Sequence, residues 1–142
     1  MARWIGIDYG KVRTGLAVTD STAIIAFPHA TIKTDQLMDS LTTLIGAEPC
    51  AGIVLGIPNK WGVSQGKGTT HSTADILAFQ SQLQKKWPSL AIELVDETNT
   101  SEEALTASIQ AGMKKSNRSK KGALDKIAAT LILQRFIDSR MN

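Results

Sequence analysis

The chain has 142 residues, of which 42% are hydrophobic, so it is long enough for one compact core and too short for two ordinary domains. We expect a single domain over residues 1–142. Its apolar runs are far shorter than the ~18 residues of a membrane span, and an apolar signal region is absent, so we expect a soluble cytosolic protein with no membrane partner. The net charge of +3 permits a polyanionic partner without requiring one.

The N-terminal part of the sequence has the pattern of an antiparallel meander. Two apolar runs at residues 3–8 and 13–19 are joined by a tight turn around Gly10, and residues 24–32 can form a third strand. Thr34 is the expected cap of a helix in which leucines recur at helical spacing up to about residue 48.

A buried strand and a loop follow this helix. The run "GIVLGI" at residues 52–57 is continuously apolar and bounded by glycine and proline, which is typical of a parallel strand buried on both faces. Residues 58–70 are rich in glycine, asparagine and serine and predict an exposed loop.

The C-terminal half continues with helices and one more strand. Apolar spacing predicts a helix ending near residue 87, a strand at 90–95, a capped helix over 100–112 and a final helix over 122–139. The basic segment 114–121 precedes the final helix. The whole pattern predicts an α/β fold with a central mixed five-stranded sheet, in which an antiparallel three-stranded meander joins two parallel strands and helices flank the sheet.

Carboxylates occur where two of the predicted strands end. Asp8 closes the first strand, and the pair Asp96-Glu97 closes the last. Because the ligand site of an α/β sheet lies beyond the carboxyl ends of its parallel strands, these positions should share one rim. The alternatives are that Asp8 only forms the turn before Gly10 and that Asp96 is an ordinary polar residue of the loop.

Asp125 adds a carboxylate from the final helix. It lies on the same helical face as several apolar residues, and a buried carboxylate is costly unless it is paired. Two small residues at 128–129 allow the helix to approach the sheet closely. We therefore expect Asp125 to reach the rim that carries Asp8 and Glu97. The alternative is that Asp125 interacts only with the dipole of its own helix.

Three carboxylates without a matching histidine or cysteine set fit a hard cation such as Mg²⁺ or Mn²⁺. The two histidines, His29 and His71, share no ligand-like spacing with each other or with the single cysteine, Cys50, which argues against zinc. Ions held by carboxylates stabilise the attacking and leaving oxygens of a phosphoryl displacement. The residues thus favour a metal site for phosphoryl chemistry, without choosing nucleic acid as the substrate.

Four segments in a fixed order carry a resemblance to a known family. They are "GIDYGKVRTGLAVTD" (6–20), "IVLGIP" (53–58), "ELVDE" (93–97) and "KKGALDKIAATLILQRFID" (120–138). Together they resemble the YqgF (RuvX) family of bacterial proteins, described as Holliday-junction resolvases and pre-16S rRNA nucleases, and the resemblance covers nearly the whole chain.

The resemblance implies a ribonuclease H-like fold and a metal-dependent nuclease. Mg²⁺ or Mn²⁺ would activate the water that hydrolyses a phosphodiester bond, in processing of pre-16S rRNA or in resolution of branched DNA. The acidic triad of the family, which is both catalytic and metal-binding, falls on Asp8, Glu97 and Asp125. A homodimer would suit a symmetric four-way junction, and nothing in the sequence identifies an interface for one.

Two positions depart from the family pattern. The family usually has arginine after the Asp-Glu pair, whereas Thr98 follows Glu97 here, which removes a planar cation that could hold a phosphate. The family commonly has an acidic residue before a glycine in the loop after the buried strand, whereas Trp61 precedes Gly62 here. We therefore expect the grip on the substrate to differ.

Basic side chains near the predicted site are candidate contacts for phosphates, which would position the nucleic acid without reading its sequence. They lie beside Asp8, on the glycine-rich loop and in the basic segment 114–121. The candidates are Lys11, Arg13, Lys60, Lys67, Lys114, Lys115, Arg118, Lys120 and Lys121.

Two other functions fit parts of the sequence. Residues 6–18 also resemble the phosphate-binding hairpin of actin-like ATPases and sugar kinases, although those folds need a second related domain that this sequence lacks. A non-catalytic, nucleic-acid-binding ribosome-maturation factor is the other alternative. The intact triad argues against it, and the threonine at position 98 leaves it open.

Overall fold

The computed structural model describes residues 2–58, 71–97, 106, 112 and 122–141. Most of the predicted glycine-rich loop, nearly all of the predicted helix over 100–112 and the basic segment 114–121 lie outside the described residues. The described strands form one five-stranded sheet in the order β3-β2-β1-β4-β5.

The sheet is mixed, as predicted. Strands β1 (Arg3–Asp8), β2 (Arg13–Thr19) and β3 (Ala26–Lys33) pair antiparallel to one another and form the predicted meander. On its other side β1 pairs with β4 (Cys50–Ile57), which runs parallel both to β1 and to β5 (Ala91–Asp96). The predicted fold class is therefore confirmed.

Strand β3 begins later than the sequence pattern predicts. The backbone N–H groups of Ile24 and Ile25 donate to Asp20 Oδ1 at 3.0 and 3.1 Å. Because these two residues are tied to a side chain of the hairpin, strand pairing with β2 starts only at Ala26, which faces Thr19.

The helices follow the predicted order with one change at the start of the first. A 3-10 turn η1 (Thr34–Gln36) leads into α1 (Leu37–Ala47). Thr34 does not cap α1, because its hydroxyl donates to the carbonyl oxygen of Gly10 at 2.6 Å and so ties down the turn after β1. Helices α2 (His71–Lys86) and α5 (Ala123–Met141) complete the described elements. In the described part of the chain, no helix is long and apolar enough to cross a membrane.

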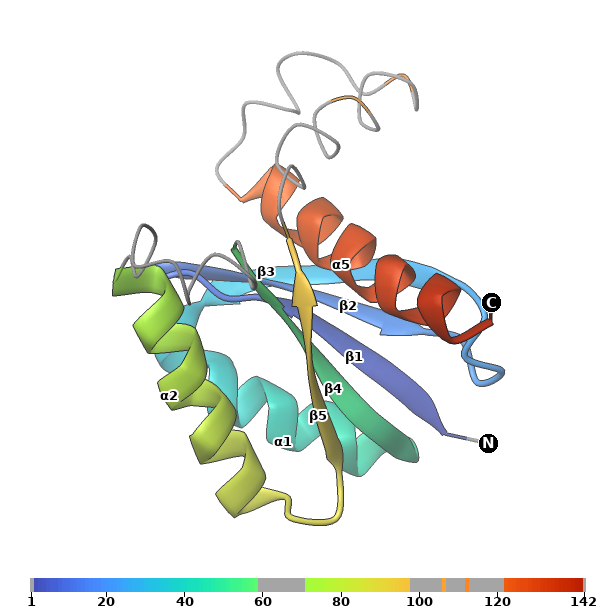
Figure 1. The fold of residues 1–142 in the computed structure, drawn as a ribbon, viewed down its shortest axis with the longest axis horizontal. Coiled ribbons are helices and arrows are strands. Elements are labelled where there is room, and N and C mark those ends of the chain that lie inside the picture. The colour runs from blue at the N-terminus through green and yellow to red at the C-terminus, as the bar shows by residue number, and fades with distance from the viewer. Residues whose placement is uncertain (1, 59–70, 98–105, 107–111, 113–121, 142) are drawn as a thin grey trace.

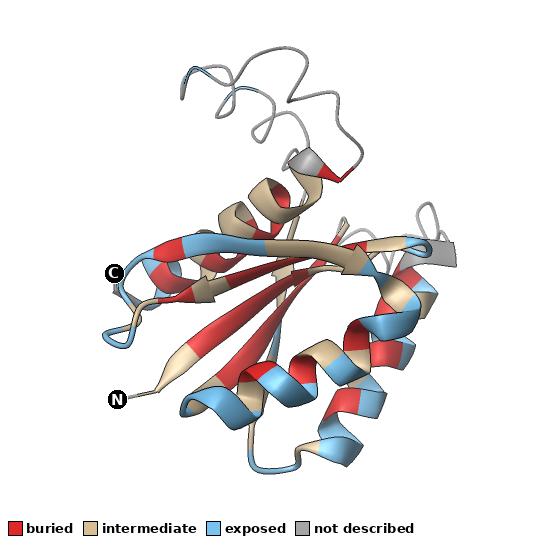
Figure 2. Ribbon diagram, turned by 180° about the vertical axis from the view of Figure 1, so that it is seen from behind, coloured by how far each residue is buried: buried red, intermediate tan, exposed pale blue. Residues whose placement is uncertain are grey.

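Helices cover both faces of the sheet (Figure 1). Helices α1 and α2 pack on one face, where Leu41 and Leu83 share a buried cluster with Ile5, Ile7, Ile53 and Leu55 of the strands. Helix α5 lies on the other face, where it packs over Trp4, Ala17, Ala26 and Val54. Figure 2 shows that the buried residues follow the central strands and the helix surfaces turned toward them.

Glycines allow α5 to lie directly on the backbone of the sheet. A Cβ atom added at Gly15 on β2 would collide with the backbone of Asp125, and one added at Gly6 on β1 would lie 2.7 Å from Leu133 Cβ. The small residues Ala128 and Ala129 are buried on the facing side of the helix, as the sequence predicts. The start of α5 is thereby held against β2, which determines where Asp125 lies.

Candidate active site

Two carboxyl groups meet at the carboxyl ends of parallel strands. Asp8 is the last residue of β1, and Glu97 follows directly after β5. Their side chains are hydrogen-bonded to each other although β4 lies between the two strands. The glycine at position 56 of β4 leaves room for this contact, because a Cβ atom there would lie 3.0 Å from Glu97 Oε2.

The Asp8–Glu97 pair holds a proton at a pH where isolated carboxyl groups have none. Burial raises the pKa of Asp8 from 3.8 to about 8, and the charges of Glu97 and Asp125 act in the same direction. Burial also raises the pKa of Glu97, and the charge of Asp96 adds to this effect. Protonated Asp8 donates to the Glu97 carboxylate. Burial and the neighbouring carboxylates thus make it costly for both groups to be ionised, and a bound cation would relieve this cost.

Asp125 faces the same site and is paired with an arginine. It lies in the first turn of α5, and its Oδ2 accepts a hydrogen bond of 2.9 Å from Arg13 Nε at the start of β2. Its negative charge reaches Asp8 and contributes to the raised pKa there. The predicted approach of Asp125 to the rim is thus present in the structure.

The three carboxylates do not converge on one point. Within the described ranges, no three histidine, cysteine, aspartate or glutamate side chains lie close enough together to hold one metal ion. Asp8 is paired with Glu97, whereas Asp125 is paired with Arg13. The oxygen-only donors and the shared proton of Asp8 and Glu97 fit a hard divalent cation, and Asp125 faces this pair from its ion pair with Arg13.

The predicted basic contacts are divided between described and undescribed residues. Lys11 is exposed in the turn between β1 and β2, and the Arg13 side chain is 38% exposed while it binds Asp125. Arg13 therefore has a structural partner that the sequence does not reveal. The other candidates lie outside the described residues, namely Lys60, Lys67, Lys114, Lys115, Arg118, Lys120 and Lys121.

Arg135 on α5 is a residue of this site that sequence reasoning missed. Its Nη1 donates to the backbone oxygen of Asp96 at 2.8 Å, and its positive charge lowers the pKa of Glu97 against the effect of burial. The available signal was its spacing, because Arg135 stands three and seven positions after the inward-facing Ile132 and Ala128. A cation at such a position of a packed helix needs a specific partner.

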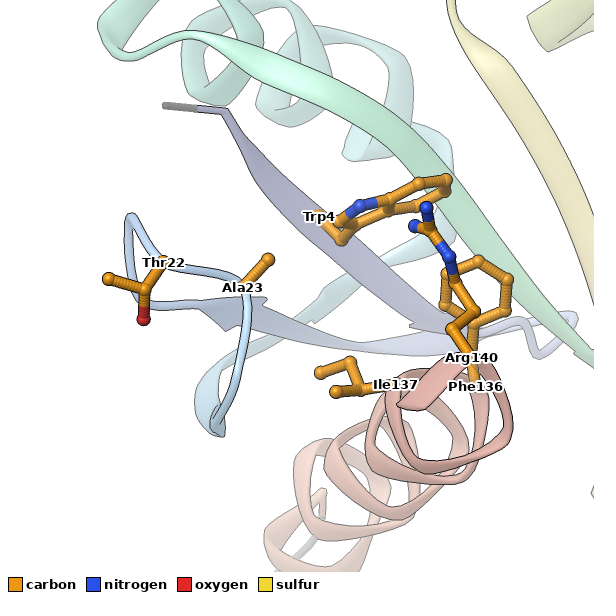
Figure 3. A pocket seen from close by; sticks show the side chains of 6 residues that line it. All are labelled: Trp4, Thr22, Ala23, Phe136, Ile137 and Arg140. Atoms are coloured by element: carbon orange, nitrogen blue, oxygen red, sulfur yellow. The ribbon is translucent and has the colours of Figure 1, made fainter. Parts of the chain in front are cut away.

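A separate pocket lies at the opposite end of α5 (Figure 3). It has a volume of about 280 Å³ and is lined by Trp4, Thr22, Ala23, Phe136, Ile137 and Arg140. Arg140 follows Asp125 by about four helical turns, roughly 22 Å along the axis. None of the three candidate carboxylates lines this pocket, so it is distinct from the site at the ends of β1 and β5.

Two relatives match the chain over nearly its full length. A protein of Phocaeicola vulgatus, named "Putative pre-16S rRNA nuclease", is 39% identical over 140 residues, which are 99% of this chain and 98% of that protein. A protein of the same name from Porphyromonas gingivalis is 37% identical over 139 residues, 98% of each chain.

Solved structures share the fold at low sequence identity. The fowlpox virus resolvase in complex with Holliday junction DNA has a TM-score of 0.62 at 12% identity and covers 99% of both chains. Thermus thermophilus RuvC in complex with a Holliday junction has a TM-score of 0.60 at 14% identity, over 99% of this chain and 96% of that one. These likenesses confirm the predicted ribonuclease H-like fold.

The family model described as "RuvX: Holliday junction resolvase" matches residues 2–139. This match includes Asp8, Glu97 and Asp125 and covers all the described strands and helices except the last two residues of α5. Together with the full-length relatives, it shows that the chain belongs to the RuvX family.

Proposed function

We propose that this chain is a divalent-metal-dependent nuclease that hydrolyses phosphodiester bonds of pre-16S rRNA in the cytoplasm. The observation that carries the proposal is the half-buried Asp8–Glu97 pair at the ends of β1 and β5, with Asp125 facing it from α5. The names of the relatives from Phocaeicola vulgatus and Porphyromonas gingivalis support the choice of substrate.

Asp8 and Glu97 are the residues that would hold Mg²⁺ or Mn²⁺, and Asp125 would complete the ligand set by moving closer to them than it lies in this structure. When bound, the ion would supply an activated water and stabilise the charge on the leaving oxygen. The contribution of the chain is to bring the two carboxyl groups together in a partly buried place, where the proton on Asp8 has to leave before both of its oxygens can act as ligands.

Arg13 holds Asp125 by its Nε, and its side chain is partly exposed beside the site. A guanidinium in this position would orient the Asp125 carboxylate and offer donors to a phosphate. Lys11 in the neighbouring turn would add a second cation, and the predicted lysines and arginine of the glycine-rich loop and of segment 114–121 would extend the contact with the polymer.

Branched DNA is the second candidate substrate. The description of the family as Holliday junction resolvases favours it, as does the likeness of the fold to two resolvases solved with junctions. Both substrates need the same carboxylates, so they differ only in which polymer the surrounding surface accepts.

The test is cleavage of two substrates under one set of conditions. Wild type and Asp8→Asn are offered a precursor 16S rRNA fragment and a four-way DNA junction at equal salt, with Mg²⁺, with Mn²⁺ and with a chelator. We expect metal-dependent cutting of the RNA that falls at least about a hundredfold in Asp8→Asn. Asp39→Asn on the exposed side of α1 is the matched control and should cut as wild type does.

Other outcomes would assign other functions. Cutting of the junction alone would replace the RNA by branched DNA. Binding of nucleic acid without cutting by wild type would favour a non-catalytic maturation factor, and saturable binding of ATP by calorimetry would favour a nucleotide-binding module. Full cleavage by Asp8→Asn would remove the carboxylate pair from the mechanism.

A further inference from the structure

The peptide group that joins Asp96 to Glu97 is held at both of its polar ends. Its N–H, which belongs to Glu97, donates to the carbonyl oxygen of Ile57 on β4 at 3.1 Å. Its carbonyl oxygen, which belongs to Asp96, accepts from Arg135 Nη1 at 2.8 Å. Because the two groups of a trans peptide point in opposite directions, one bond is made toward β4 and the other on the far side.

The bond on the far side matters because β5 is an edge strand. The sheet order places β5 last, with β4 as its one neighbour in the sheet. Among the described residues no further strand pairs with β5 on this side, and the carbonyl oxygen of Asp96 is bound by the Arg135 guanidinium instead. A hydrogen bond from a charged donor is stronger than one between neutral groups. The bond from Arg135 therefore fixes the peptide group directly before the Glu97 side chain.

Arg135 also connects the two halves of the site. It lies on α5 together with Asp125, ten residues or roughly 15 Å further along the helix. Helix α5 therefore carries one candidate carboxylate directly and holds the backbone of a second through Arg135. Since the glycines of β1 and β2 fix the helix on the sheet, this arrangement leaves Glu97 little freedom relative to Asp8.

We propose that Arg135 is a positioning residue, which fixes the Asp96–Glu97 peptide so that the Glu97 carboxylate meets Asp8 in a geometry ready for a divalent ion. The part that concerns the ion rests on the proposed function. The part that concerns the peptide does not, because it is a property of the metal-free chain.

The first measurement is hydrogen exchange of the Glu97 amide in metal-free protein. In Arg135→Gln, the end of β5 loses its anchor to α5, and we expect this amide to exchange about tenfold faster or more. Arg140→Gln is the matched control, since it removes the same charge from the same helix at the distant end, where the guanidinium lies 5.1 Å from the centre of the Trp4 ring. It should leave the Glu97 amide unchanged.

The second measurement is Mn²⁺ affinity, read by the paramagnetic resonance of the free ion. Loss of a group that orients a metal ligand typically lowers affinity about 10- to 100-fold, and we expect a loss in this range for Arg135→Gln and none for Arg140→Gln. Arg135→Lys keeps a charged donor and should recover most of both effects. If Arg135 served only the stability of the fold, Arg135→Gln would lower thermal stability, and Arg135→Lys would not restore the slow amide exchange and the Mn²⁺ affinity.

The outcomes separate the two proposals. Unchanged exchange and unchanged Mn²⁺ affinity in Arg135→Gln would overturn the positioning role, as would equal losses in both glutamine variants. Faster exchange of the Glu97 amide in Arg135→Gln, with no Mn²⁺ binding by wild type, would support the positioning of the peptide by Arg135 and reject the metal site. If Arg135→Gln does not fold, hydrogen exchange of the Arg135 guanidinium in wild type provides the test. A slowly exchanging Nη1 proton would support the bond to Asp96, and a freely exchanging one would overturn it.

Discussion

Asp8 keeps its proton up to about pH 8 in the folded chain and loses it near pH 3.8 when unfolded. Between these values the folded state binds more protons than the unfolded state, so the free energy of unfolding of metal-free protein falls as pH rises. The raised pKa of Glu97 acts in the same direction. We expect Asp8→Asn to flatten this fall, measured by urea denaturation in a chelator from pH 4 to pH 9.

The control for this pH effect is Asp39→Asn, which removes an exposed carboxylate from α1 and should retain the pH dependence of wild type. A wild-type free energy of unfolding that stays constant across this range would contradict the burial of a protonated Asp8.

Arg13 is the residue for which stability and function should separate. Its ion pair with Asp125 is partly exposed, and such pairs contribute only about 0–1 kcal/mol. Arg13→Gln should therefore unfold at nearly the wild-type urea concentration. If Arg13 also contacts a phosphate, its loss should lower the slope of log binding constant against log salt by about 0.7 to 0.9 for single- or double-stranded nucleic acid.

This effect is measured by binding of the same RNA fragment over a series of salt concentrations. Lys85→Gln removes an exposed cation from the end of α2 and should leave the slope unchanged. An unchanged slope in Arg13→Gln would limit this arginine to holding Asp125.

At the scale of elements, the placement of α5 depends on glycines that leave the sheet backbone bare. In Gly15→Ala the new methyl group would meet the backbone of Asp125, which cannot rotate away as a side chain can. We expect a loss of about 1–3 kcal/mol in the free energy of unfolding, together with reduced cleavage, because Asp125 moves with the helix. Urea denaturation and a cleavage assay of the same preparation test both effects.

Gly46→Ala is the matched control for this substitution. Gly46 lies in α1 with nothing within 4 Å of an added Cβ, so alanine there should stabilise the helix by up to about 1 kcal/mol. A Gly15→Ala variant that is as stable as wild type would show that α5 can withdraw from β2 without cost.

An element could be predicted from the sequence where neighbouring residues alone determine its bounds. Strands β1 and β2 have the bounds that the sequence predicts, because each is a short apolar run that ends at a charged residue or a turn. The predicted starts of β3 and α1 are wrong. Both are set by side chains that bind backbone groups elsewhere, Asp20 across a hairpin and Thr34 on the turn after β1.

At the scale of the whole molecule, the common rim of Asp8 and Glu97 could be predicted from the topology of parallel strands alone. The pairings around it could not. Arg13 and Asp125 are 112 positions apart in sequence, and Arg135 and Asp96 are 39 apart. The small residues at 128–129 predict that α5 lies close to the sheet, but they do not indicate which side chains then pair across it. The roles of the three carboxylates as metal ligands remain predictions.

The same carboxylate pair links metal binding to the stability of the whole fold. A ligand that binds only the folded chain stabilises it by about 2.7 kcal/mol at a hundred times its dissociation constant. Because Mn²⁺ must displace the proton of Asp8, this stabilisation should be large near pH 8.5 and lost near pH 5. Thermal unfolding at constant ionic strength, with and without Mn²⁺, measures it. Asp8→Asn should show no shift at either pH, whereas Glu93→Gln on the exposed side of β5 should shift as wild type does. An equal shift in Asp8→Asn would place the ion elsewhere on the molecule.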